Sequence, residues 1–150
     1  KLTYHNDPEK TRASHNHYGW ASLGDVGWVD EEGYLYLTDR KSFTIISGGV
    51  NIYPQEIENL LVSHPQIADA AVIGAPDPDL GERVTAIIQP LDMGKAGEEL
   101  AQDILGFCRA NLSILKVPRS VEFRADLPRT PTGKLLKRLL RDEFWDKADV

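Results

Sequence analysis

Hydrophobic positions follow two different periods along the chain, and the period changes at clusters of Gly, Pro and Asp. Strict alternation and short β-branched runs predict strands, because successive strand side chains face opposite sides of a sheet. Apolar residues spaced three and four apart predict amphipathic helices, because these positions share one helix face. The predicted strands are residues 43–47, 67–76, 82–90 and 119–125, with a hairpin over 27–40 that turns at "DEEG". The predicted helices are residues 54–64, 97–112 and 134–145.

The mixture of elements lacks a regular strand–helix rhythm, which favours an α+β fold. We expect a short mixed sheet and hairpins flanked by about three helices. The clearest boundary lies at "DRKS", residues 39–42, where one hairpin ends and a new strand begins. In the last helix we expect one apolar side facing inward and one basic side facing outward. The inward residues are Leu135, Leu136, Leu139, Leu140 and Phe144, and the outward residues are Lys137, Arg138 and Arg141.

Composition places the chain among globular proteins, since 41% of its 150 residues are hydrophobic and 27% are charged. No apolar run approaches the ~20 residues of a membrane span, so we expect no transmembrane segment. Cys108 is the only cysteine, which excludes an internal disulfide and favours a reducing, cytoplasmic location. Its four-residue spacing from Ile104 and Leu112 indicates a packed thiol rather than a nucleophile.

Charge is unevenly spread along the chain. Residues 1–115 hold 8 Lys/Arg and 17 Asp/Glu, whereas residues 116–141 hold 8 and 2. An acidic protein with one basic segment suits a small, multiply charged ligand better than nucleic acid, which is bound by neutralising many phosphates. We therefore expect no nucleic-acid partner. One alternative stays open, a non-catalytic domain that binds a nucleotide or nucleic acid through 116–141.

Two glycine turns are candidates for ligand contact. Gly48 and Gly49 allow close backbone approach to a ligand, or simply bend the chain between a strand and a helix. "RTPTGK" places Lys134 at the expected start of the last helix, where a cation is mildly unfavourable, on an approach stiffened by Pro131. Lys134 is therefore either a solvated lysine or a rigidly held cation for an anion supplied from elsewhere. The four histidines lack ligand spacing, so we expect no metal site.

Four segments, taken in order, resemble the adenylate-forming enzymes, which include acyl-CoA synthetases, nonribosomal adenylation domains and luciferases. They are "SLGDVGWVDEEGYLYLTDRK", "DRKSFTIISGGVNIYPQEIE", "GAPDPDLGERVTAII" and "KVPRSVEF…LPRTPTGKLLKRLLR". Within that family the chain is most similar to the fatty-acyl or aryl CoA ligases. The resemblance implies that 1–40 end the large N-terminal lobe, that 41–42 form a hinge, and that 43–150 form the small C-terminal lobe.

The implied reaction is an ATP-dependent, AMP-forming ligation of a carboxylic acid to a thiol. The acid first forms an acyl-adenylate and pyrophosphate, and CoA then displaces AMP after the small lobe has rotated. ATP, CoA and Mg²⁺ are the implied cofactors, bound mainly by the N-terminal lobe, and that lobe is the implied partner along with ATP, the acid and CoA. The acid pocket lies upstream, so we expect the isolated chain to be inactive. A carrier-protein pantetheine in place of CoA remains an alternative.

The resemblance also implies roles for individual residues in the first half-step. Lys134 matches the catalytic lysine that bridges the substrate carboxylate and the α-phosphate. Asp25, which on local grounds alone suits an Asx turn, matches the aspartate that binds the ribose hydroxyls, and Arg40 matches an arginine that contacts the ribose. Ser42 occupies the hinge position, where the family usually has Asp or Lys.

In the second half-step, Gly48 and Gly49 match the loop that lines the pantetheine tunnel, where a side chain would block a narrow channel. Lys116 and Arg119 are possible contacts for the CoA phosphates. Leu115 stands where the family often has an aromatic residue, so the resemblance leaves stacking on the CoA adenine open.

Overall fold

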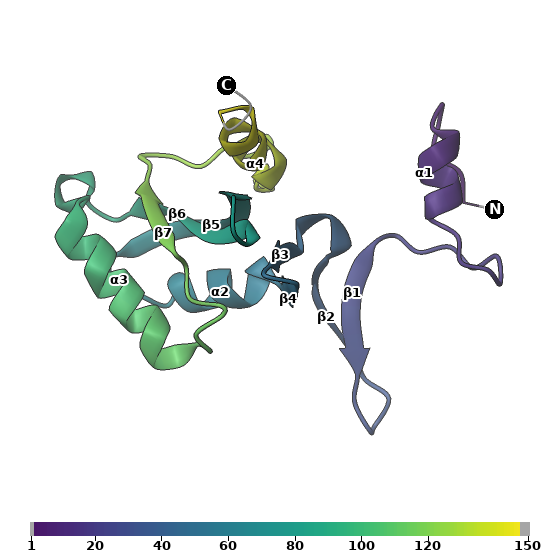
Figure 1. Ribbon diagram of the computed structural model, residues 1–150, viewed down its shortest axis with the longest axis horizontal. Helices are drawn as coiled ribbons and strands as arrows, with labels where there is room; N and C mark the ends of the chain where they lie inside the picture. The colour runs from purple at the N-terminus through teal and green to yellow at the C-terminus, as the bar shows by residue number, and fades with distance from the viewer. Residues whose placement is uncertain (1, 148–150) are drawn as a thin grey trace. The chain divides into compact units, whose positions relative to one another are not determined.

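The computed structural model describes residues 2–147 and divides into two compact units, the first ending at Ser42 and the second beginning at Phe43. The first unit contains α1 (Pro8–Ala13), β1 (Asp25–Val29) and β2 (Leu35–Arg40) (Figure 1). The second contains β3 (Ile45–Ser47), β4 (Val50–Ile52), α2 (Pro54–Leu61), β5 (Ile67–Asp77), β6 (Gly81–Pro90), α3 (Glu98–Asn111), β7 (Ser120–Phe123) and α4 (Lys137–Asp146). Single 3-10 turns cover Lys41–Phe43 and Met93–Lys95. The assignment of 41–42 as a hinge stays a prediction.

The second unit is built on one five-stranded sheet. β5 and β6 form a long antiparallel hairpin, and β7 pairs with β6 in parallel. The short β3–β4 hairpin joins the sheet through one pair, Ser47 with Gly81. This mixed sheet with separate helices confirms the α+β fold.

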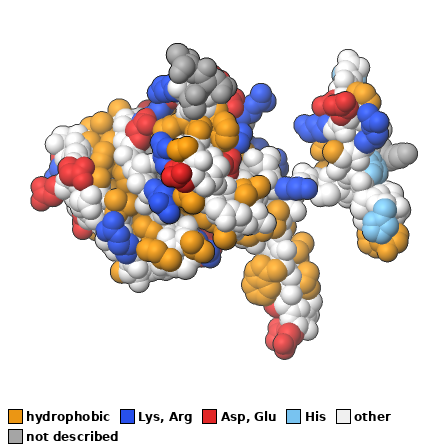
Figure 2. All heavy atoms as spheres, viewed as in Figure 1, with side chains coloured by type: hydrophobic (Ala, Val, Ile, Leu, Met, Phe, Trp, Pro, Cys, Tyr) orange, Lys and Arg blue, Asp and Glu red, His pale blue; other side chains and the backbone are white. Residues whose placement is uncertain are grey.

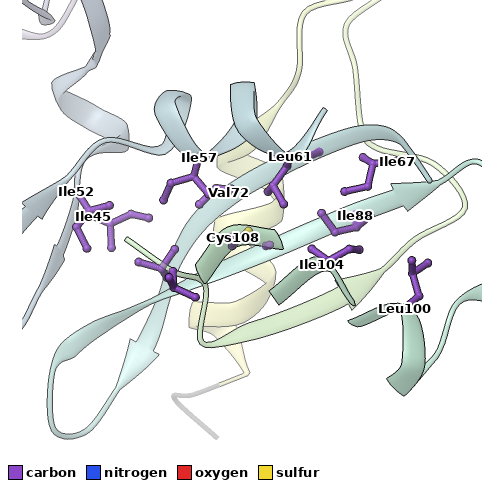
Figure 3. Packing of buried hydrophobic residues seen from close by; sticks show 14 residues of the cluster. Ile45, Ile52, Ile57, Leu61, Ile67, Val72, Ile88, Leu100, Ile104 and Cys108 are labelled. Carbon is purple, nitrogen blue, oxygen red and sulfur yellow. The ribbon is translucent and has the colours of Figure 1, made fainter. Parts of the chain in front are cut away.

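Two apolar layers cover opposite faces of the sheet, because β5 and β6 alternate their side chains between them. On one face, α2 and α3 pack against the sheet through a cluster shown in Figure 3. That cluster includes Ile45, Ile52, Ile57, Leu61, Ile67, Val72, Ile88, Leu100, Ile104 and Cys108. On the other face, α4 packs through Leu140 on Ala71, Ile73, Ile87 and Leu127. Helices therefore lie on both sides of the β5–β6 hairpin (Figure 1).

The structure corrects three sequence expectations. The helix α1 was missed, although Asp7 caps it by accepting a hydrogen bond from the Lys10 N–H at 2.8 Å, with Pro8 at its first position. The strand β4 was also missed. The last helix begins at Lys137 rather than Lys134, because 134–136 stay extended: Leu135 bridges Arg129 and the Leu136 N–H donates to the Pro128 carbonyl at 2.8 Å.

The shifted start also changes the faces of α4. Leu139 is 50% exposed, whereas Lys137, expected outside, is buried. Leu140 is buried, and Leu135 and Phe144 pack partly buried against the same cluster. The expected faces were therefore wrong at one apolar and one basic position of α4.

A buried ion pair joins the two helical layers around the open edge of β5. Lys137 Nζ of α4 lies 2.8 Å from Glu58 Oε1 of α2, and the two side chains are 9% and 7% exposed. Glu58 Oε1 also accepts a hydrogen bond from the Val72 N–H at 2.7 Å, which occupies a donor on this edge strand. Lys137 Nζ lies 5.2 Å from the centre of the Phe43 ring, a cation–π contact. One pair therefore connects α2, α4, β5 and the first residue of the unit.

Replacement of Lys137 by Met should destabilise the chain by about 3–5 kcal/mol, because the buried Glu58 carboxylate would lose the ammonium that offsets its charge. The double replacement Glu58→Gln with Lys137→Met should recover most of that loss, since Gln still accepts from Val72 while both charges are gone. Arg138→Met is the matched control, because Arg138 is 86% exposed. Urea unfolding measures all three, and a Lys137→Met variant within about 0.5 kcal/mol of the unchanged chain contradicts the role of the pair.

Candidate functional site

Lys134 stands at the end of a tight hairpin turn. The Gly133 N–H donates to the Thr130 carbonyl at 2.8 Å, and the Thr130 N–H donates to the Lys134 carbonyl at 2.8 Å. Gly133 has a φ of 86°, the left-handed conformation that such three-residue loops need after a type I turn. The Lys134 N–H donates to Thr130 Oγ1 at 3.0 Å. The side chain of Lys134 is exposed, so a structured backbone presents a solvated ammonium outside any helix.

Arg129 ties this turn to the sheet. Its Nη1 donates to the Gly133 carbonyl at 2.6 Å, and its Nη2 forms an ion pair with Asp69 of β5. The other carboxylate oxygen of Asp69 accepts the Ala70 N–H at 2.9 Å. Sequence reasoning missed this contact, because the partners Arg129 and Asp69 are sixty residues apart and no local pattern links them.

Most of the basic segment is neutralised by carboxylates. Six of its eight Lys and Arg residues form ion pairs: Lys116–Glu56, Arg124–Glu122 and Arg124–Glu143, Arg129–Asp69, Lys137–Glu58, Arg138–Asp142 and Arg141–Glu82. Four of these carboxylates belong to the acidic first part of the chain. The folded segment is therefore no basic stripe, and the nucleic-acid alternative loses its support.

Two basic residues of 116–141 stand apart from this pattern. Within residues 2–147, neither Lys134 nor Arg119 has a carboxylate in ion-pair distance. Both side chains are exposed. They are therefore the cations of this segment that an external anion can reach without displacing an internal partner.

Gly48 and Gly49 form the turn of the β3–β4 hairpin rather than the expected bend between a strand and a helix. Ser47 pairs with Val50 across the turn, and the two glycines have φ values of 56° and 80°. Two successive positive φ angles identify a type I′ turn, the two-residue loop that fits strand twist. A Cβ at Gly49 would meet no atom within 4 Å, so inside this unit its requirement for glycine comes from backbone conformation.

The glycine turn and the Lys134 turn lie at opposite ends of the β5–β6 hairpin. The Gly48 N–H donates to the Leu80 carbonyl at 2.9 Å, just beyond the end of β5 at Asp77. The Lys134 turn is held at Asp69, eight residues earlier in the same strand. At about 3.3 Å per residue, these anchors are about 26 Å apart. The two turns therefore cannot enter one small site together.

Lys116 and Arg119 differ in how available they are. Lys116 Nζ contacts both carboxylate oxygens of Glu56, at 2.7 and 2.8 Å. The Arg119 N–H donates to the Val84 carbonyl at 2.8 Å while its side chain is exposed. Beside them, Ile114 and Leu115 are exposed apolar residues. A phosphate would meet Arg119 directly, whereas Lys116 would first have to leave Glu56.

Asp25 and Arg40 lie together in the first unit. They are cross-strand partners in the β1–β2 hairpin, and Arg40 Nε lies 3.3 Å from Asp25 Oδ1. Both side chains remain solvent-accessible. Arg40 and Ser42 also line an open depression of about 700 Å³ within this unit. The expected nucleotide-binding pair is thus brought together by strand register.

The β1–β2 hairpin exposes large apolar side chains on both of its faces. Trp28 and Tyr36 stack with ring centres 4.4 Å apart, yet both are exposed. Leu35 and Leu37 are exposed as well, and Figure 2 shows hydrophobic side chains along the hairpin behind an acidic tip. A two-stranded ribbon with uncovered apolar faces is marginal alone and is typical of a surface that another part of a protein covers.

The remaining reactive groups offer no second centre in the part of the chain that the structure describes. Cys108 is buried, which raises the pKa of its thiol to about 11 and confirms its packing role. The hydrogen bond from Arg124 lowers the pKa of Glu143 and links the end of β7 to α4. Within residues 2–147, no group of three His, Cys, Asp or Glu could hold a metal ion, and no helix is long and apolar enough to span a membrane.

Comparison with known proteins identifies a family to which most of this chain is similar. The family model described as the AMP-binding enzyme C-terminal domain matches residues 56–134. The chain is 45% identical over 143 residues to a 3-[(3aS,4S,7aS)-7a-methyl-1,5-dioxo-octahydro-1H-inden-4-yl]propanoyl:CoA ligase of Rhodococcus jostii, and 43% identical over 141 residues to the long-chain-fatty-acid–CoA ligase FadD13 of Mycobacterium tuberculosis. These matches cover 95% and 94% of this chain but only 27% of each relative.

A solved structure has a similar fold over almost the whole of this chain. The crystal structure of ATP-bound MatB from Rhodopseudomonas palustris matches with a TM-score of 0.81 at 36% identity, over 94% of this chain and 27% of that protein. The likeness of fold, together with the family model, confirms the expected small C-terminal lobe. The chain thus spans about a quarter of the length of the curated relatives it matches.

Replacement of Gly49 by Val should destabilise the β3–β4 hairpin by about 1–3 kcal/mol, because a β-branched residue is strained at a φ of 80°. Gly48→Asn is the control, since Asn is favoured at the first central position of a type I′ turn. Urea unfolding compares the two variants. Equal stability of Gly49→Val and Gly48→Asn is the outcome that contradicts the turn assignment.

Proposed function

Because the chain belongs to the family of AMP-binding enzyme C-terminal domains, we propose that it is the C-terminal part of an AMP-forming acyl-CoA ligase. In the proposed first half-step, a substrate carboxylate attacks the α-phosphate of ATP, which gives an acyl-adenylate and releases pyrophosphate. In the second, the CoA thiolate attacks the acyl carbon, which gives the thioester and releases AMP. The acid pocket and the phosphate-binding loop belong to the large N-terminal lobe, the proposed partner of this one.

The observation that carries this proposal is the ammonium of Lys134, which has no carboxylate partner among residues 2–147 and projects from a hydrogen-bonded turn. During adenylation, negative charge shifts onto phosphoryl oxygens and the departing pyrophosphate, so a preorganised cation stabilises the transition state more than the ground state. Lys134 would lie between the substrate carboxylate and the α-phosphate. A lysine with an internal carboxylate partner would first have to break that pair.

Asp25 and Arg40 would hold the ribose of the nucleotide. The Asp25 carboxylate accepts hydrogen bonds from ribose hydroxyls, and Arg40, 3.3 Å away, fixes its orientation and adds a donor. A relative crystallised with ATP supports ATP as the nucleotide. We assign Mg²⁺ to the large lobe, which would bind the ATP phosphates that complete the coordination of the ion.

The second half-step would use the opposite end of the sheet. The Gly48–Gly49 turn would line the pantetheine path, and Arg119 would meet a CoA phosphate, with Lys116 joining it on release from Glu56. Because the points that anchor the two turns lie about 26 Å apart along β5, the lobe would have to rotate about residues 41–42 between the half-steps. Such a rotation would need a hinge, and we assign it to 41–42, at Ser42.

Free CoA is the acceptor we favour, because the curated relatives are named as CoA ligases. The acid is proposed only as a carboxylic acid, because the pocket that selects it lies in the large lobe. A carrier-protein pantetheine would use the same half-step chemistry. Assay of the full-length protein with each thiol distinguishes the two acceptors.

In the full-length protein, Lys134→Ala should lower acid-dependent pyrophosphate exchange by about 10²–10³, the usual effect of losing one charge-stabilising donor. Thioester formation from supplied acyl-adenylate should be largely unchanged. Arg138→Ala serves as the control, because this exposed cation of the same segment should leave both half-steps intact. Equal losses in the two half-steps would refute the assigned role of Lys134.

The isolated 150-residue chain should form no measurable acyl-CoA from acid, ATP and CoA, because it spans about a quarter of the relatives' length. Turnover is followed by AMP release, with the full-length protein as the positive control. Product formation by the isolated chain contradicts the division of the site between two lobes.

A further inference from the structure

We propose that Arg129 is a positioning residue for Lys134, one that fixes the peptide bond from which the lysine projects. The proposal rests on the adenylation role given to Lys134 above. Arg129 reaches the reaction only through this peptide and is itself no contact of the substrate.

The Gly133–Lys134 peptide is held at both of its polar atoms by side chains. Its carbonyl accepts a hydrogen bond from Arg129 Nη1 at 2.6 Å, and its N–H donates to Thr130 Oγ1 at 3.0 Å. Fixing both atoms fixes the plane of the peptide. That plane sets the ψ angle of Gly133 and the φ angle of Lys134, and hence the direction of the lysine side chain.

This restraint matters because of the residue that precedes the lysine. Gly133 has no Cβ and samples more backbone conformations than any other residue type. A Cβ added at Gly133 would meet no atom within 4 Å, so packing against neighbouring groups does not restrict the backbone conformation of the turn. The hydrogen bonds of the hairpin turn and the two bonds to this peptide therefore keep Lys134 in one orientation, and Arg129 supplies one of them.

The second arm of Arg129 transfers the rigidity of the sheet to the turn. Arg129 Nη2 pairs with Asp69, whose carboxylate also accepts the Ala70 N–H at 2.9 Å. Asp69 lies in β5, which pairs with β6 along nearly its whole length. The planar guanidinium can hold two acceptors at a fixed separation, which the single ammonium of a lysine cannot do.

The pairing with Asp69 also argues against a second role as a free cation. The carboxylate offsets the charge of Arg129, unlike that of Lys134, which has no carboxylate partner among residues 2–147. An arginine that bound the triphosphate directly would be expected to have no internal carboxylate competing for its charge. Arg129 therefore acts by fixing the position of Lys134, whereas Lys134 acts through its positive charge.

The test uses the full-length protein with Arg129→Met, Arg129→Lys and Asp69→Asn, and with exposed Arg138→Met as the matched control. Acid-dependent pyrophosphate exchange gives kcat and the KM for ATP, and supplied acyl-adenylate with CoA gives the second half-step. Arg129→Met should lower kcat of adenylation by about 10–100-fold, the scale of a misplacement near 1 Å. Arg129→Lys and Asp69→Asn should lose less, because each keeps part of the network. The KM for ATP and the second half-step should stay within about twofold of the unchanged protein.

Combination with Lys134→Ala separates positioning from general structural damage. If Arg129 acts only through Lys134, Arg129→Met should cause no further loss in the Lys134→Ala protein, because effects through one shared partner are not additive. A further loss there, equal losses in both half-steps, a raised KM for ATP with unchanged kcat, or unchanged adenylation would each overturn the proposal. Normal adenylation by Lys134→Ala alone would instead overturn the proposed function on which it rests.

Discussion

The buried pair of Glu58 and Lys137 holds the two faces of the small lobe in one arrangement. Each charge is costly to bury alone, so the pair is stable only when α2 and α4 meet at the edge of β5. The glycine turn leads through β4 directly into α2, and the Lys134 turn leads directly into α4. Both candidate turns therefore lead into helices, α2 and α4, that this one ion pair joins. Phe43, the first residue of the lobe, packs on the same ammonium, which ties the entry of the chain to this junction.

Ion pairs elsewhere in the lobe decide which of its cations remain available to bind an anion. The acidic first part of the sequence supplies partners to four of the eight cations of the basic segment, and Lys134 and Arg119 have no carboxylate partner among residues 2–147. Lys134 lies at the end of the β5–β6 hairpin that is remote from the glycine turn. In the proposed function, the lobe thus carries a cation for phosphate at one end and a glycine turn at the other. A change of half-step would then require movement of the whole lobe rather than rearrangement within it.

The sequence predicts the long elements well, because α2, α3, β5 and β6 carry strong apolar periods and clear helix-start residues. It also points to Lys134 and to Asp25 and Arg40 as candidate site residues, through motifs whose order is specific; their roles stay predictions. It misplaces the start of α4, because "GKLLK" continues a helical period into residues that a hairpin with Pro128 and Arg129 holds extended. The contacts of Arg129 with Asp69 and of Lys137 with Glu58 could not be predicted from the sequence, since each joins residues far apart along the chain.

The proposed function requires that the two turns belong to one lobe and serve the site in different half-steps. The most direct measurement is the distance between spin labels at Thr132→Cys and Val50→Cys in the full-length protein, with other accessible cysteines removed; buried Cys108 needs no replacement. With an acyl-adenylate analogue and then with CoA added, the account predicts one narrow distance of roughly 25 Å in both states. A distance that collapses toward roughly 10 Å on CoA binding would mean that the turns converge on one site, and would contradict the account.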